Sequence, residues 1–164
     1  METRIREIEP ETPIVVNKFK FTCDDHDASI PKPLPQQGGF GMLIVGKPRS
    51  GKTNLLLALT TKAHRNFNRK FDRVYLWSPS IHTMENDPYE LLPDDQKFDG
   101  VSLENLNNVL GQIKDSGEKI LFIMDDVVND MKKSAGVQNT LSKMLMNRRH
   151  LAGANGSCSF IITT

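Results

Sequence analysis

Eight consecutive residues in the first third of the chain fit the pattern G-x-x-x-x-G-K-[ST], and they run from Gly46 to Thr53 as GKPRSGKT. Glycines allow a backbone to curl closely around an anion, and the first turn of a helix has amides without partners inside the helix. A lysine adds a cation for the outer phosphates, and a threonine hydroxyl is a suitable Mg²⁺ ligand. The pattern therefore predicts a loop that binds ATP together with Mg²⁺.

Individual roles follow from the pattern. Lys52 is expected at the β- and γ-phosphate oxygens, and Thr53 in the Mg²⁺ shell. Pro48 has no N–H group, so the amides of residues 49–53 must form the phosphate cradle. Arg49 either reaches a phosphate oxygen or a neighbouring subunit, or lies solvated at the loop tip. The predicted nucleotide-binding residues are Gly46, Arg49, Ser50, Gly51, Lys52, Thr53 and Asn54.

A second motif is the stretch ILFIMDDV (Ile120–Val127), in which an apolar run ends in two aspartates. In parallel α/β sheets, ligands bind at the carboxyl ends of the strands. Asp125 is expected to hold Mg²⁺ opposite Thr53, and Asp126 to orient and deprotonate the attacking water. An acid beside the metal ligand favours an NTPase over a small-molecule kinase. The alternative is a turn-forming pair that caps the next segment.

The last apolar run and the residues before it supply further candidates. If this run lies beside the first strand, Thr163 and Thr164 fall near the γ-phosphate, where a hydroxyl can sense hydrolysis or position water. They can equally be ordinary strand-end threonines. Either Arg148 or Arg149 can stabilise phosphoryl-transfer charge in a neighbouring subunit. Alternatively, both are cations favoured by a helix C-terminus.

These motifs lie between regular elements that the apolar pattern predicts. Strands are expected at residues 40–45, 72–80, 119–124 and 157–164, and helices at 53–64, 102–115 and 137–149. Strands that alternate with helices predict right-handed crossovers and a mainly parallel sheet in an α/β three-layer sandwich. Residues 1–37 are expected to form an N-terminal arm and linker, with a short strand at Pro13–Phe21. Residues 38–164 are expected to form the ATPase core.

Composition narrows the function classes only slightly. The 164 residues carry a net charge of +1, so bulk charge does not argue for nucleic-acid binding. The 2 cysteines, Cys23 and Cys158, are far apart and have no metal-ligand spacing, which favours a reducing compartment such as the cytoplasm. Since no apolar run approaches the ~20 residues of a membrane span, no membrane partner is predicted. The basic stretch Lys62–Arg73 fits a solvated helix end better than a DNA contact.

Several stretches together resemble the poxvirus-type DNA-packaging ATPases of large double-stranded DNA viruses, a branch of the FtsK–HerA superfamily of additional-strand P-loop ATPases. They are IPKPLP before GFGMLIVGKPRSGKTN, then FDRVYLWSPS, ILFIMDDV, NRRHL and SFIITT, and they cover about residues 30–164. The resemblance implies a homo-oligomeric ring that hydrolyses ATP to move viral double-stranded DNA into a capsid, with a capsid or portal protein as a further partner. It also implies a location in the host cytoplasm or the virion, and it favours a catalytic arginine at Arg148 or Arg149.

The resemblance implies the sheet order 5-1-4-3-2, in which a further strand flanks the first one. The chain stops at Thr164, after the fourth predicted strand, so it is expected to be truncated at its C-terminus and to leave an apolar edge exposed. Two other functions stay open. One is a P-loop nucleotide kinase, which requires a mobile arginine-rich lid. The other is an assembly protein that binds nucleotide without hydrolysing it.

Overall fold

The computed structural model describes residues 30, 34–35, 38–60, 67, 70–80 and 89–164. Most of the predicted arm, including its strand at Pro13–Phe21, lies outside these residues, as do the last residues of the predicted helix at 53–64. Among the described residues, no helix has both the length and the hydropathy needed to cross a bilayer.

One parallel sheet forms the centre of the described part of the chain. Its strands are β1 (Gly41–Ile44), β2 (Arg73–Trp77), β3 (Lys97–Phe98), β4 (Lys119–Met124) and β5 (Ser157–Thr163), in the order β1-β5-β4-β2-β3. The four predicted strands therefore lie in the expected order, with the last strand between the first and the third. The two-residue strand β3 was not predicted, because so short a segment has no measurable apolar period.

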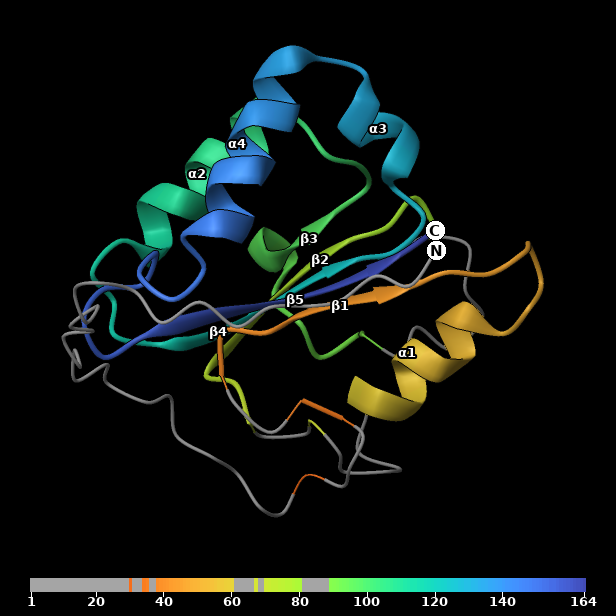
Figure 1. Ribbon diagram of the computed structural model, residues 1–164, viewed down its shortest axis with the longest axis horizontal. Coiled ribbons are helices and arrows are strands. Elements are labelled where there is room, and N and C mark those ends of the chain that lie inside the picture. The colour runs from red at the N-terminus through yellow and green to blue at the C-terminus, as the bar shows by residue number, and fades with distance from the viewer. Residues whose placement is uncertain (1–29, 31–33, 36–37, 61–66, 68–69, 81–88) are drawn as a thin grey trace, which may run out of the picture.

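Helices cover both faces of the sheet, as Figure 1 shows. Helix α1 (Lys52–Thr60) lies on one face, and α2 (Leu103–Ile113), α3 (Val128–Lys132) and α4 (Ala135–Met146) lie on the other. Two apolar clusters fill the layers: Phe122 and Phe160 belong to the cluster under α2 and α4, and Leu56 and Ile161 to the one under α1. The predicted three-layer α/β sandwich is confirmed.

Serine side chains cap the first turns of α2 and α4. Ser102 accepts a hydrogen bond from the Asn105 amide, and the Asn105 side chain accepts one from the Ser102 amide, so the two residues form a complete capping box at the start of α2. Ser134 caps α4 in a similar way by accepting a hydrogen bond from the Val137 amide. The predicted helix at 137–149 therefore begins earlier and ends at Met146, which places Arg148 and Arg149 beyond it.

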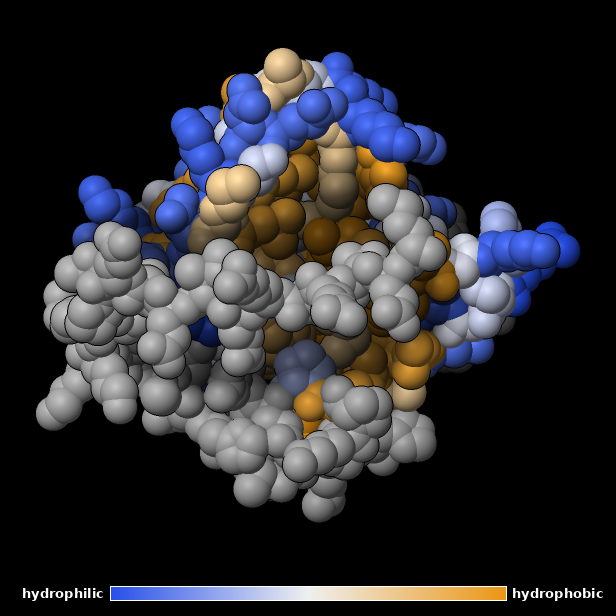
Figure 2. Space-filling view, in the orientation of Figure 1, coloured by the Kyte–Doolittle hydropathy of each residue, from blue (hydrophilic) through white to orange (hydrophobic). Residues whose placement is uncertain are grey.

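Strand β1 lies at one edge of the sheet and pairs only with β5 among the described strands. Two apolar side chains at this edge are exposed: Leu43, within β1, at 62%, and Val45, just after it, at 72%. Figure 2 shows hydrophobic surface over this edge, between the helices of the upper layer and α1 below. These two side chains give this edge an apolar character, and the predicted truncation stays a prediction.

The cysteine of β5 leads to a chemical prediction. Cys158 is free and fully buried, and burial raises the pKa of its thiol to about 12. Because only the thiolate attacks a disulfide reagent, we expect the thiol of a Cys23→Ser variant to react with DTNB at pH 8 at least about 100-fold more slowly when folded than in urea. Stopped-flow absorbance would measure both rates. Equal rates in the two conditions would contradict the buried position of Cys158.

Candidate phosphate and metal site

The predicted phosphate loop joins the end of β1 to the start of α1. The Gly46 amide donates to the Thr164 carbonyl over 3.0 Å, and the Thr164 amide donates to the Ile44 carbonyl over 3.0 Å. The loop therefore begins at the carboxyl edge of the sheet, directly beside the end of β5. This is the edge at which parallel α/β sheets bind ligands.

The shape of the loop favours glycine most clearly at Gly51, which has a φ of +89° in the left-handed region. A Cβ atom at Gly46 would press on the Ser50 hydroxyl, which would have to turn away. Arg49 also has a positive φ, of 64°, which is unusual for a residue with a side chain. Its side chain is exposed, as the solvated-tip interpretation expects, and a contact with phosphate stays a prediction.

Hydrogen-bond donors converge on the inside of this loop. The Lys52 ammonium donates to the carbonyls of Gly46 at 2.9 Å and Lys47 at 3.2 Å, so it spans the loop. The first hydrogen bond of α1 runs from the Leu55 amide to the Gly51 carbonyl at 2.9 Å. The amides of residues 52–54 precede it and have no acceptor within the helix, and the helix dipole makes this end positive. A cation and a set of amides together fit phosphate oxygens.

The loop and the acidic pair meet at the same edge of the sheet. The Thr53 hydroxyl of α1 donates to Asp125 Oδ2 at 3.2 Å, although the two residues are 72 positions apart. Asp125 follows β4 and is only 4% exposed, and its amide donates to the Trp77 carbonyl at the end of β2. A hydroxyl and a carboxylate this close can share one cation.

The fold is of the P-loop NTPase type. It combines the phosphate loop after β1, the acidic pair after β4 and the parallel strand order that places β5 between these two strands. No three or more His, Cys, Asp or Glu side chains gather into a metal site anywhere in the described residues. The Thr53–Asp125 pair instead fits Mg²⁺, which takes oxygen ligands and shares its shell with phosphate and water.

Of the two strand-end threonines that the sequence predicts, Thr163 is the one whose side chain joins this site. The Thr163 hydroxyl is fully buried and donates to Asp125 Oδ1 at 2.5 Å, and it accepts a hydrogen bond from the Asp126 amide at 3.1 Å. The ladder pairs Met124 with Ile162, so the next pair along the strands is Asp125 with Thr163. Counting this register from the apolar runs would have selected Thr163, whereas Thr164 contributes its backbone to the start of the loop.

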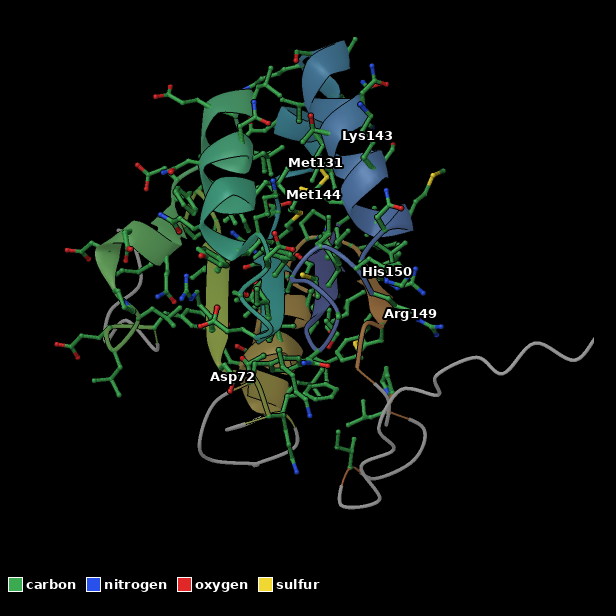
Figure 3. The ribbon with its side chains drawn as sticks, turned by 90° about the vertical axis from the view of Figure 1, so that its left-hand side faces the viewer. Asp72, Met131, Lys143, Met144, Arg149 and His150 are labelled. Carbon is green, nitrogen blue, oxygen red and sulfur yellow. The ribbon has the colours of Figure 1, made fainter. Side chains whose placement is uncertain are left out.

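Arg148 and Arg149 do not join the site of their own chain. Arg148 Nε donates to the Gly39 carbonyl and its Nη1 to the Leu145 carbonyl, and its own carbonyl accepts from the Cys158 amide. Cys158 is near the start of β5. At the usual rise of a strand, it lies about 17 Å from Thr163 at the other end. Arg149 and His150 follow Arg148 directly and therefore lie near the start of β5, at the amino edge of the sheet, and both are labelled in Figure 3. A role in a neighbouring subunit stays a prediction.

The basic stretch at 62–73 is described only in part, since Lys62, Arg65 and Arg69 lie outside the described residues. Arg73 forms an ion pair with Glu118 at 2.9 Å, and it donates a hydrogen bond to the Tyr75 hydroxyl at 3.2 Å. The contact with Tyr75, assisted by the charge of Glu118, raises the pKa of Arg73. Arg73 therefore lies in a strand with internal partners, and not at the solvated helix end that the sequence predicts.

No protein-family model matches the chain, and no curated protein matches it. Among solved structures, the chain is similar to the assembled type III secretion ATPase EscN of enteropathogenic E. coli, determined in complex with its central stalk EscO, at 15% identity and a TM-score of 0.39. The match covers 97% of this chain and 50% of the EscN chain, so this chain spans about half of that protein's length. So distant a likeness does not indicate a family, and the function is inferred from the site itself.

Proposed function

We propose that this chain binds ATP with Mg²⁺ and hydrolyses it. The observation that carries the proposal is the contact between Thr53 and Asp125, which places the Lys52 loop and the acidic pair at one edge of the sheet. Anion-binding donors and a buried carboxylate at hydrogen-bond distance are the two components of a site for a metal-bound triphosphate.

Each residue of the site has a chemical task in the proposal. Lys52 and the amides of the first turn of α1 bind the phosphate oxygens and stabilise the charge that develops on them. Thr53 and Asp125 hold Mg²⁺, which when bound neutralises phosphate charge. Asp126 is exposed directly after the buried Asp125, so its carboxylate can reach solvent water. It orients the water and accepts its proton as the water oxygen bonds to the γ-phosphorus and ADP leaves.

The use of this energy is the second part of the proposal. We propose that the chain works as a homo-oligomeric ring that moves viral double-stranded DNA into a capsid, within the host cytoplasm or the virion. Its support is the resemblance of residues 30–164 to packaging ATPases. Within that resemblance, the SPS stretch begins at Ser78, which is buried and follows the strand whose Trp77 carbonyl binds the Asp125 amide. In a ring, Arg148 or Arg149 would have to reach the site of the next subunit.

An ATPase assay tests both parts. We expect release of inorganic phosphate from Mg²⁺-ATP by this chain and by a form extended past residue 164, with faster release when double-stranded DNA is added. Transfer of phosphate to a nucleoside or nucleotide, instead of to water, would replace the proposal with the kinase alternative. ATP binding without turnover in either form would indicate a nucleotide-binding assembly protein. Turnover that does not respond to DNA would leave the ATPase standing and overturn the DNA motor.

A further inference from the structure

One buried hydroxyl connects both aspartates of the site. Thr163 Oγ1 donates its proton to Asp125 Oδ1 and accepts the amide hydrogen of Asp126. The side chain of Thr163 is completely buried at the end of β5, on the sheet face that α1 covers. A threonine hydroxyl has a single donor, so its proton is committed to Asp125.

The contact with Asp125 determines how that carboxylate is oriented. Its Oδ1 accepts from Thr163 on β5, and its Oδ2 accepts from Thr53 on α1. The carboxylate is therefore held between the sheet and the helix that begins with the phosphate loop. Without the Thr163 donor, the contact with Thr53 alone would be left to fix the plane of the buried carboxylate.

The contact with Asp126 supports an unusual backbone conformation. Asp126 has a φ of 56°, in the left-handed region that residues with side chains seldom occupy. Such conformations persist when the surrounding structure holds them in place. The bond from the Asp126 amide to Thr163 holds the peptide that joins the two aspartates, and the direction in which the exposed Asp126 side chain leaves the strand depends on that peptide.

We propose that Thr163 is a positioning residue for the hydrolysis proposed above, and the inference rests on that function. It aims Asp125 Oδ2 toward Thr53 and the metal, and it holds the Asp126 backbone so that the carboxylate of Asp126 faces the reacting water. It acts through the two aspartates and touches neither phosphate nor metal. A single hydroxyl thereby couples metal binding to water activation.

The test uses Thr163→Val, which keeps the shape of the side chain and removes the hydroxyl. We expect the Mg²⁺ concentration that supports half-maximal binding of a fluorescent ATP analogue to rise about tenfold, as expected for a buried acceptor that loses its donor. Binding of the analogue in EDTA should stay the same. We also expect the Asp126 amide to exchange its hydrogen at least about tenfold faster, because it has lost its acceptor. Fluorescence titration and hydrogen-exchange mass spectrometry measure these two effects.

Matched variants separate this role from a general loss of stability. Thr163→Ser keeps the hydroxyl and should restore both the Mg²⁺ concentration for half-maximal binding and the exchange rate of the Asp126 amide. Ser159→Ala removes another fully buried hydroxyl of β5, one that accepts from the Gly39 amide near the other end of the strand, and should change neither value. If Thr163→Val does not fold, Thr163→Cys, with a similar volume and a weak donor, carries the same expectation.

The outcomes distinguish this inference from the proposed function. A Thr163→Val chain with unchanged Mg²⁺ dependence and unchanged Asp126 exchange would overturn the positioning role alone. A wild-type chain that binds Mg²⁺-ATP without hydrolysing it would overturn the ATPase, while the Mg²⁺ shift would still support the orientation of Asp125. A wild-type chain that binds no Mg²⁺-nucleotide would overturn both.

Discussion

Replacement of Asp126 by asparagine lowers ATP turnover by about 10²–10⁴-fold, the usual contribution of a general base, and leaves ATP binding intact. The amide has nearly the shape of the carboxylate but cannot accept the proton of the attacking water. Asparagine also tolerates the left-handed backbone that Asp126 adopts, so the fold should be preserved. Steady-state phosphate release and a fluorescent-nucleotide titration would measure the two quantities on the same samples.

Asp115→Asn is a closely matched control for this experiment. Asp115 is also an exposed aspartate with a φ of 56°, and it lies between α2 and β4, at the amino edge of the sheet. The same substitution in the same backbone conformation should leave turnover unchanged. If Asp126→Asn retains wild-type turnover, Asp126 is not the base. If neither the variant nor the wild-type chain turns over ATP, the nucleotide-binding assembly protein becomes the better description.

Replacement of Lys52 by methionine should weaken ATP binding and turnover together, by about 10²–10³-fold, as expected when a preorganised charged donor is removed. The side chain keeps its length but loses the ammonium, which spans the loop through the Gly46 and Lys47 carbonyls. The loop therefore loses a phosphate ligand as well as the contacts that hold its shape. Isothermal titration with Mg²⁺-ATP and a phosphate-release assay would measure the two losses.

Lys143→Met serves as the control for Lys52→Met, because Lys143 is an exposed lysine on α4, in the other helical layer (Figure 3). It should bind and hydrolyse ATP like the wild-type chain. Retention of full ATP affinity by Lys52→Met would mean that the loop is a structural glycine turn between β1 and α1, and the proposed function would fail.

The main elements could be predicted because each rests on a local pattern. The run ILFIM is apolar throughout and becomes β4, in which five of the six residues are buried. Elements without such a pattern were missed: β3 has two residues and α3 has five. Ser134 was missed as the cap of α4 because Ala135 and Gly136 begin the helix before its first buried residue, Val137.

The edge of the sheet at which Arg148 and Arg149 lie could not be predicted from the sequence. The sequence places Arg148 and Arg149 between a helix and the last strand but does not say at which edge of the sheet they lie. Helix α4 lies on the return from the carboxyl edge, where β4 ends, to the amino edge, where β5 begins, as the connection between two neighbouring parallel strands must. This return carries both arginines away from the phosphate loop and brings Arg148 to the Gly39 carbonyl.

By itself, the sequence determined the phosphate loop, because the glycines, lysine and threonine that define it all lie within eight consecutive residues. It also identified both aspartates as candidates, because they follow an apolar run directly. Only the tertiary structure decided that Thr53, Asp125 and Thr163 meet, since they come from α1, the residue after β4, and β5, and are 72 and 38 residues apart. The physical reason is the strand register: pairing of β4 with β5 brings Asp125 and Thr163 to the same face of the sheet, and the packing of α1 on that face supplies Thr53.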